Sequence, residues 1–242
     1  MALLLVSTAT AQMDERAREL LEGAQLEVES VEYRTMEQTM TMIWYEPDGT
    51  VVSETTTHIA IDFEDRRVAM STFADDELVS KTMYVDGEST LFTPDTGAIP
   101  APPMLAAIFD LMLDEPAQDS WGDATVASYD GFHSYAGIVS GEQVTVMGVD
   151  VPVPGLDMAT DMRVLFDDAG RIAAVVVGTA EAGTVLMVFD TPIPALPLSL
   201  QSVTTYMLEG EEAVLTSRTI FEEVRLNEPL DERLFDLEVG GR

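Results

Sequence analysis

The stretch TMTMIWYEPDGTVVSETTTHIAIDF, residues 39–63, decides the fold. Apolar side chains recur at every second position from Met40 to Trp44, and again at Ile59, Ile61 and Phe63. This period of two is that of a β-strand with one buried face. Between the two runs, Pro47-Asp48-Gly49 supplies a turn, because proline fixes φ and glycine accepts a positive φ. The stretch therefore predicts a hairpin of two long strands.

Short strand patterns separated by acidic or glycine-containing turns continue along the chain. Further strands are predicted at 67–73, 78–85, 89–93, 124–129, 133–139, 143–147, 158–167, 171–177, 184–190, 200–208 and 213–224. Sequential strands joined by tight turns pair most simply as antiparallel neighbours. The sequence thus predicts a mainly β (α+β) protein built on a large curved antiparallel sheet.

Two segments break this rhythm with helical patterns. DERARELLEG, residues 14–23, consists of helix formers, and Gly23 is expected to end that helix. The segment AIPAPPMLAAIFDLMLDEP, residues 98–116, predicts a helix at 104–113 framed by prolines. Because this second helix is apolar nearly all round, we expect it to lie against the concave face of the sheet.

The composition supports a folded but strongly acidic chain. Of 242 residues, 46% are hydrophobic, which is enough for a core, so we expect one domain over residues 12–242. The formal net charge is -32, from 44 acidic and 12 basic residues, and Lys81 is the sole lysine. Such a field repels nucleic acid and anionic lipid headgroups. The even spread of acids favours a halophilic acidic surface over a dedicated basic partner or a calcium store.

The first residues, MALLLVSTATAQ, suggest export. An apolar run is followed by Ala9-Thr10-Ala11, a cleavage pattern that predicts a signal peptide over residues 1–11. An apolar N-terminal tail, or a start codon assigned too late, is the alternative, because a basic first region is missing. With no cysteine for a lipid anchor and no other long apolar run, we expect a soluble, monomeric protein exported to the periplasm.

The residues needed for common catalytic chemistry are sparse. Nucleotide, acyl-transfer and zinc motifs are absent from the sequence, and His58 and His133 are its two histidines. His58 follows three threonines on the polar face of its strand. His133 is adjacent to Ser134, and neighbouring strand residues point to opposite faces. We therefore expect no enzyme activity and no cofactor.

One acidic turn superficially resembles a calcium loop. Asp161, Asp167 and Asp168 precede Gly170, but the ligand order of an EF-hand and its terminal glutamate are missing. A solvated turn is the favoured interpretation, so no metal site is predicted.

The positive functional signal is methionine, present 14 times. Several methionines fall at positions expected to face inward, on strands (Met40, Met42, Met70, Met83, Met147, Met162) or on the apolar helix (Met104, Met112). Methionine is flexible and polarisable, so such a lining adapts to ligands of varied shape. The alternative interpretation is that these are ordinary core residues.

Three segments, in order, resemble the LolA/LolB-like family of lipoprotein carriers and lipoprotein-sorting proteins. They are YVDGESTLFTPDTGAI (84–99), FDDAGRIAAVVV (166–177) and VRLNEPLDERLFDLEV (224–239). The resemblance implies an unclosed half-barrel around short helices, with an apolar cavity for acyl chains, and makes the apolar helix a lid or plug. Two departures are that Arg66-Arg67 lack the proline of the family's arginine stretch and that VPVPGLDMATDM (151–162) has no counterpart.

The expected function is therefore a periplasmic carrier or chaperone for lipid or for lipoprotein acyl chains. The alternative is an envelope-stress sensor or protein-interaction module on the same scaffold. The expected ligand-binding residues are Ile59, Ile61, Val68, Met70, Met83, Leu91, Leu105, Ile108 and Met112, with Arg66 or Arg67 at the rim.

Overall fold

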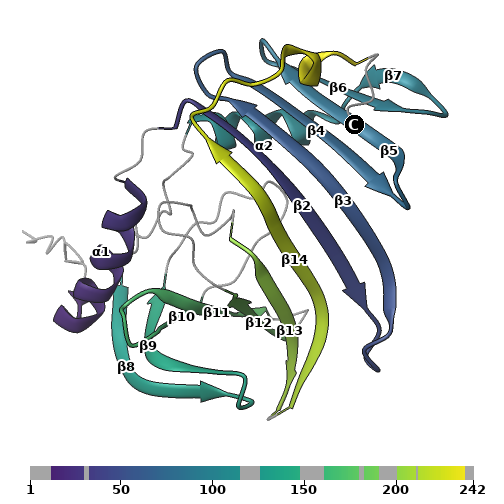
Figure 1. The fold of residues 1–242 in the computed structure, drawn as a ribbon. Coiled ribbons are helices and arrows are strands. Elements are labelled where there is room, and N and C mark those ends of the chain that lie inside the picture. The colour runs from purple at the N-terminus through teal and green to yellow at the C-terminus, as the bar shows by residue number, and fades with distance from the viewer. Residues whose placement is uncertain are drawn as a thin grey trace, which may run out of the picture.

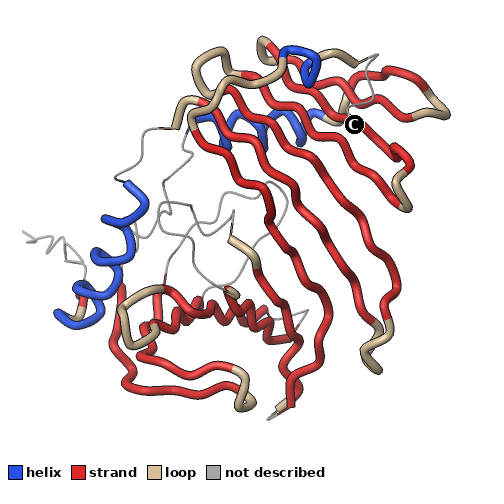
Figure 2. Tube along the Cα trace, viewed as in Figure 1, coloured by secondary structure: helices blue, strands red, loops and turns tan. Residues whose placement is uncertain are grey.

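A single curved sheet dominates the computed structural model, which describes residues 12–29, 33–114, 126–147, 161–179, 183–190, 201–210 and 212–237. Its fourteen strands follow the order β1-β8-β9-β10-β11-β12-β13-β14-β2-β3-β4-β5-β6-β7. β1 (Gln12–Met13) pairs in parallel with β8, and the other pairs are antiparallel. The sheet is not closed, since it ends at β1 and β7 (Figures 1 and 2). The expected open antiparallel half-barrel is confirmed.

The sheet consists of two arms that each follow chain order. The first arm contains β2 (Thr35–Tyr45), β3 (Val51–Asp62), β4 (Arg67–Ala74), β5 (Glu77–Val85), β6 (Glu88–Thr93) and β7 (Gly97–Pro100). The second contains β8 (Val126–Tyr135), β9 (Val139–Met147), β10 (Asp161–Phe166), β11 (Ile172–Thr179), β12 (Gly183–Phe189), β13 (Val203–Glu209) and β14 (Glu212–Leu226). The arms join where β14 pairs with β2, with Thr219 opposite Met42. The hairpin of residues 39–63 therefore lies in the middle of the sheet.

Two helices lie on the concave side of the sheet (Figure 1). α1 (Glu15–Glu29) lies at the β8 edge, and α2 (Pro103–Asp114) lies under the first arm. Asp14 starts α1 by accepting a hydrogen bond from the backbone nitrogen of Arg16, an N-cap contact. The buried core beside α1, the α1 cluster, comprises Ala17, Leu20, Leu21, Ala127, Val144, Val146, Val164, Phe166, Ile172, Val175, Val177 and Phe189. α1 thus closes the apolar concave face of the second arm.

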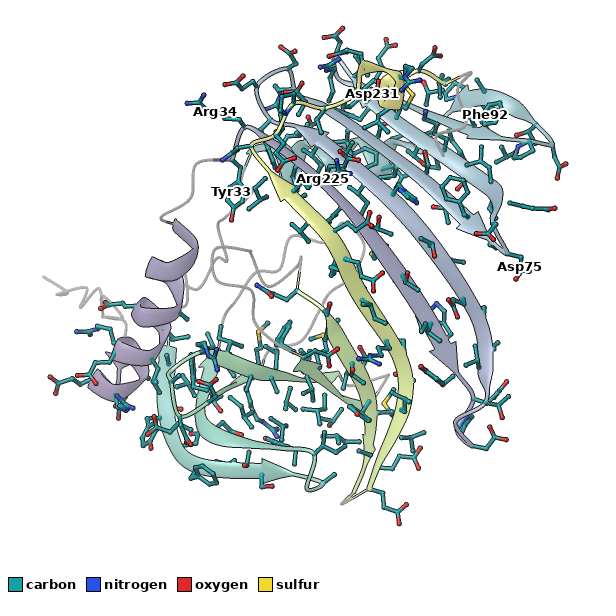
Figure 3. The ribbon with its side chains drawn as sticks, viewed as in Figure 1. Tyr33, Arg34, Asp75, Phe92, Arg225 and Asp231 are labelled. Carbon is teal, nitrogen blue, oxygen red and sulfur yellow. The ribbon has the colours of Figure 1, made fainter. Side chains whose placement is uncertain are left out.

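The C-terminal segment covers the convex face of the first arm. It contains the 3₁₀ helix η3 (Glu232–Phe235), and Leu230, Leu234, Phe235 and Leu237 pack against Ala60, Ala69 and Met83. The sole lysine, Lys81, is buried there and donates a hydrogen bond to the carbonyl oxygen of Asp236. Burial lowers the pKa of Lys81 below its ordinary value, because desolvation penalises the ammonium form. Lys81 thus helps to fix this segment, which Figure 3 shows over the first arm with its residue Asp231 labelled.

The bent β8–β9 hairpin covers the convex face of the second arm. Its tip residues Tyr135 and Val139 pack against a cluster of Leu165, Ala174, Val176 and Leu186. The bend lies at Asp130 and Gly131, where glycine has a φ of 90°. The Asp130 carboxylate accepts hydrogen bonds from Thr145, at 2.5 Å, and from the Gln143 amide, at 2.9 Å. These contacts hold the two limbs of the hairpin at the bend.

Two sequence-based expectations are corrected by the structure. The predicted strands 124–129 and 133–139 form one strand, β8, followed by a turn at residues 136–138, because the Asp130-Gly131 pair bends the chain without reversing it. Gly23 does not end α1, which continues to Glu29. Glycine costs a helix only about 1 kcal/mol relative to alanine, and the residue that follows it, Ala24, packs against the α1 cluster. The expected signal peptide, residues 1–11, lies outside the described residues.

Gly141 is a position where a side chain cannot fit. A Cβ at this residue would lie 2.2 Å from the carbonyl oxygen of Phe166, which is backbone and cannot swing away. Gly141→Ala should therefore push β9 off β10 and destabilise the fold by at least 2 kcal/mol, about the cost of overpacking a core. The matched control is Gly178→Ala, because nothing lies within 4 Å of its Cβ position. Urea unfolding of both variants measures the difference; equal midpoints would contradict the close approach.

Asp130 makes the bent hairpin sensitive to acid. Burial alone raises the pKa of its carboxyl, but hydrogen bonds from Thr145, Gln143 and Ser128 outweigh that effect, and the pKa is lowered. Because the folded pKa is below the unfolded one, the stabilisation is present above about pH 4 and is lost as the pH falls through the folded value. Asp130→Asn should cost no more than about 1 kcal/mol at pH 7, since the carboxylate is largely exposed. The difference from the unsubstituted chain should vanish near pH 2, measured as unfolding midpoints against pH.

Candidate functional site

The concave face of the first arm carries an apolar surface covered by α2. The buried core here, the α2 cluster, consists of Met36, Ile59, Ile61, Val68, Tyr84, Phe109 and Leu113. Leu105 and Ala106 of the helix, and Met40 and Met70 of the sheet, pack against it. The Tyr84 and Phe109 rings lie 5.8 Å apart and are inclined by 54°, a favourable tilted arrangement. The helix thus contacts the sheet through apolar side chains.

A polar contact fastens this helix at one point. The Tyr84 hydroxyl donates a hydrogen bond to Asp110 Oδ1, and Arg66 Nη2 lies 3.3 Å from the same oxygen. Arg66 occupies the turn after β3 with a φ of 50°. The hydrogen bond to Asp110, together with burial, raises the pKa of Tyr84 above its ordinary value, so the hydroxyl stays a donor at physiological pH. These three side chains form what we call the Asp110 latch.

Between the two helix-covered clusters, the concave face is a strip of half-buried side chains at the centre of the sheet. Cross-strand pairs place Thr219, Met42 and Thr55 in one row, and Phe221, Met40 and Thr57 in the next. Thr57 is buried and its hydroxyl lies 3.1 Å from that of Thr72 on β4. The strip combines flexible methionines with threonines, of which Thr57 has its hydroxyl partnered within the sheet. It joins the α1 and α2 clusters into one continuous concave surface.

The structure brings most of the expected ligand-binding residues to one face. Ile59, Ile61, Val68, Met70 and Leu91 share the concave face, Leu105 contacts it from α2, and Arg66 lies at the rim against α2. Ile108 and Met112 belong to α2, but their side chains lie outside the described residues. Contact of these residues with a ligand stays a prediction.

Of the two arginines expected as alternatives at the rim, Arg66 lies there, whereas Arg67 does not face the concave side, and neither does Met83, which was expected to face inward. Arg67 and Met83 both lie on the convex face: Met83 is in the core under the C-terminal segment, and Arg67 donates to Glu232 at 2.8 Å and lies 4.4 Å from the Phe235 ring centroid. Alternation in β5 misleads because both of its faces are covered, so apolar residues occur on each. Tyr84, adjacent to Met83, is the residue that points inward.

Two members of the Asp110 latch, Tyr84 and Asp110, were not predicted from the sequence. Tyr84 begins the segment 84–99 that carries the family resemblance, yet its own role was not predicted. Asp110 is an isolated acid in an otherwise apolar helix, and this isolation is the signal that could have marked it. A lone charge in an apolar helix requires either solvent or a partner, and the structure supplies Tyr84 and Arg66.

The residues considered for catalysis or metal binding make local contacts. His58 is exposed on the convex face, and its ring meets that of Phe73 edge-on at 5.4 Å. His133 Nε2 lies 3.2 Å from the carbonyl oxygen of Asp130 in the hairpin bend. Asp167 accepts hydrogen bonds from the backbone nitrogens of Ala169 and Arg171, which orders the turn before β11. The Asp161 side chain lies outside the described residues.

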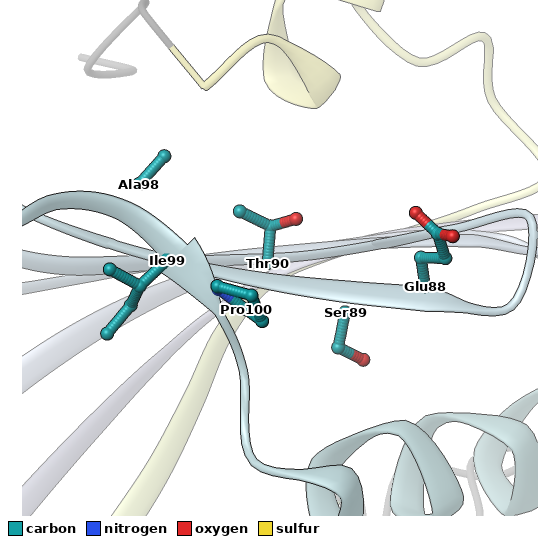
Figure 4. Close-up of a pocket in the computed structure, with 6 residues that line it drawn as sticks. All are labelled: Glu88, Ser89, Thr90, Ala98, Ile99 and Pro100. Carbon is teal, nitrogen blue, oxygen red and sulfur yellow. The ribbon is translucent and has the colours of Figure 1, made fainter.

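Two pockets lie along strands of the first arm. One, of about 450 Å³, lies at the β6–β7 edge and is lined by Glu88, Ser89, Thr90, Ala98, Ile99 and Pro100 (Figure 4). Ser89 points from this edge toward the side on which α2 lies. The other, of about 370 Å³, is lined by Glu37, Gln38, Thr39, His58, Ser71, Glu223, Arg225, Pro229, Asp231 and Leu234. It lies beside the C-terminal segment and is mainly polar, unlike the α2 cluster.

Comparison with known proteins identifies the fold. No protein-family model and no curated protein sequence matches the chain. Among solved structures, a domain assigned to outer membrane lipoprotein sorting from Vibrio parahaemolyticus matches with a TM-score of 0.53 and 11% identity, covering 93% of this chain and 97% of that one. A LolA superfamily protein from Nitrosomonas europaea matches with a TM-score of 0.51 and 10% identity, covering 92% and 99%.

A third similar structure is a DUF1329 family protein from Desulfovibrio piger, with a TM-score of 0.54, 9% identity and coverage of 92% and 98% of the two chains. At such identities the likeness shows the fold alone. The chain therefore has the fold of LolA superfamily proteins and lipoprotein-sorting domains, as the sequence resemblance implied. Separately, no helix among the described residues has both the length and the apolar character needed to cross a bilayer.

The Asp110 latch should decide how firmly α2 is held. Tyr84→Phe removes the hydroxyl but keeps the ring against Phe109, so about 1 kcal/mol should be lost, a value reduced by the exposure of Asp110. Amide hydrogen exchange should accelerate in α2 and not in β3 or β4. Tyr135→Phe, which removes a 2.7 Å hydrogen bond to Gln143 in the other arm, is the control. Unchanged exchange in α2 of Tyr84→Phe would argue against the latch.

Proposed function

We propose that this protein is an exported, non-catalytic carrier that binds lipid or the acyl chains of lipoproteins on its concave face, with α2 as a displaceable cover. The observation that carries the proposal is how α2 is attached. Among the described side chains of α2, the contacts with the sheet are apolar, apart from the latch at Asp110. An acyl chain would make apolar contacts with the sheet, as the helix does, so an acyl chain can replace α2 on this surface.

Two opposing free-energy terms, the burial of the ligand and the loss of helix burial, govern such an exchange. Burial of apolar groups is worth about 0.8 kcal/mol per methylene, whether a ligand or a helix supplies them. A long acyl chain therefore gains several kcal/mol on entering, while α2 loses a comparable amount on leaving and exposes Phe109 and Leu113. Because the two terms oppose each other, changes at the latch shift the equilibrium between covered and loaded forms.

The similar structures support a carrier over an enzyme at the level of class. One is assigned to outer membrane lipoprotein sorting and another to the LolA superfamily, and neither description names a reaction. The local contacts of His58 and His133 also give no reason to assign either residue a catalytic role. Export to the periplasm, as the first eleven residues suggest, would place the protein where lipoprotein acyl chains need shielding from water.

Two substitutions on opposite faces of β2 test the carrier proposal. Met40 and Ile43 are both half-buried and apolar, but Met40 packs against the α2 cluster while Ile43 lies opposite Arg218 on the other face. Met40→Glu should reduce uptake of a palmitoylated lipopeptide at least tenfold, because it places a charge on the apolar concave surface that the acyl chain would occupy. Ile43→Glu should leave uptake unchanged. Native mass spectrometry of the full chain with the lipopeptide gives the bound fraction.

Three results are informative. A one-to-one adduct that is lost only in Met40→Glu supports the concave site. Equal loss in both variants would mean that the charge acts through general destabilisation, and circular dichroism melting would show this. A folded, unsubstituted chain that takes up no lipopeptide would overturn the carrier proposal and favour a protein-interaction module on the same scaffold.

A further inference from the structure

Gln38 carries a buried amide without a partner. It is 1% exposed, and neither its Nε2 nor its Oε1 has a hydrogen-bond partner in the described part of the chain. It lies between Met36 and Met40 on β2 and pairs with Ile59 across to β3. Since alternate residues share a face, its side chain belongs to the concave face beside the α2 cluster. A fully buried primary amide with four unused hydrogen-bonding positions is rare in proteins and calls for an explanation.

α2 offers little that could satisfy this amide. Between Pro103 and Asp114, the two aspartates are the only residues with polar side chains, and Asp110 is engaged by Tyr84 and Arg66 at the rim. The described residues that α2 places on the sheet are Leu105, Ala106, Phe109 and Leu113, all apolar. The covered form therefore leaves Gln38 both desolvated and unbonded, which is unfavourable.

We propose that Gln38 is the polar anchor of the ligand site and binds the carbonyl oxygen of a lipid ester or amide when α2 is displaced. This inference rests on the proposed carrier function and adds a ligand class to it: a carbonyl-bearing acyl lipid rather than bare hydrocarbon. The Nε2 group donates to the carbonyl, and Oε1 remains available to an amide N–H or to water that enters with the ligand. The acyl chain then takes the apolar surface that α2 leaves.

A second buried polar atom, Ser89 Oγ, lies on the same concave face, which agrees with a continuous apolar surface under α2. Ser89 Oγ on β6 is also buried without a partner, and Ser89 pairs with Tyr84, so it shares the concave face. β2 and β6 are separated by four strand steps, or about 19 Å at the usual spacing. A twelve-residue helix such as α2 is about 18 Å long. The apolar surface beneath the helix is thus bounded at each end by a strand that carries an unsatisfied polar group.

A matched pair of lipids tests the anchor. One is 1-palmitoyl lysophosphatidylcholine, and the other is its 1-O-hexadecyl ether analogue, which differs by lacking the carbonyl. Titration calorimetry below the micelle threshold gives both dissociation constants for the full chain. The unsubstituted protein should prefer the ester about tenfold, equivalent to about 1.4 kcal/mol. Gln38→Leu should bind both lipids alike, with the affinity for the ether unchanged.

The Tm of the ligand-free variant distinguishes an anchor from a packing residue, because loss of a packing residue would lower the Tm. Gln38→Leu should raise the Tm of the ligand-free protein, because it removes an unsatisfied buried amide while it lowers the preference for the ester. Thr57→Val is the control on the same face. Its hydroxyl has a partner in Thr72, so this variant should melt lower and keep the ester preference. If leucine prevents folding, Gln38→Met serves, since methionine has a similar shape.

The possible outcomes separate the two proposals. Equal binding of ester and ether by the unsubstituted chain would overturn the anchor and leave the carrier function standing. Loss of both lipids in Gln38→Leu, with a lowered Tm, would reduce Gln38 to a packing residue and also overturn the anchor. Binding of neither lipid by the folded, unsubstituted chain would overturn the carrier function itself and the anchor with it.

Discussion

Apolar side chains on both faces of an open sheet must be shielded from water, and four segments in the described part of the chain do so. α1 and α2 cover the concave face of the two arms. The C-terminal segment covers the convex face of the first arm, and the tip of the bent β8–β9 hairpin covers that of the second. A closed barrel would need no such covers on its inner face. Because the sheet is open, each covering segment is a separate element that can be attached to the sheet firmly or weakly.

The four covers are tied down to different degrees. The C-terminal segment is held by the buried Lys81 and by Arg67, and the bent hairpin by the hydrogen bonds around Asp130. α1 is continuous with β1 and is joined to β9 through an ion pair between Arg16 and Glu142. α2 has apolar contacts and one latch. In the part of the chain that the structure describes, both helices thus have few side-chain polar ties to the sheet, and these are partly exposed, whereas the Lys81 contact of the C-terminal segment is buried.

Much of the fold was predictable because alternation and turn chemistry are local properties. The hairpin of residues 39–63, the run of short strands and the apolar helix all follow from neighbouring residues. Pairing of β14 with β2 and the covering of both faces are long-range properties, and they account for the errors. Met83 was placed on the concave face, and Arg67 was offered beside Arg66 for the rim, because alternation gives two faces without saying which is inner. Gln38 and Tyr84 could not be chosen from sequence, since their significance lies in having or lacking a partner.

Two polar features act on α2 in opposite directions. The Asp110 latch stabilises the covered form at the rim, where Asp110 and Arg66 are about half exposed and their attraction is screened by solvent. The unbonded amide of Gln38 destabilises the same form from within, where no solvent compensates. If apolar contacts alone held the helix, the free-energy preference for the covered state would be set by the apolar area that the helix buries. Under the proposed carrier function, the partly exposed Asp110 latch adds little to that preference and the unbonded Gln38 amide lowers it, which is the direction that ligand-driven displacement of α2 requires.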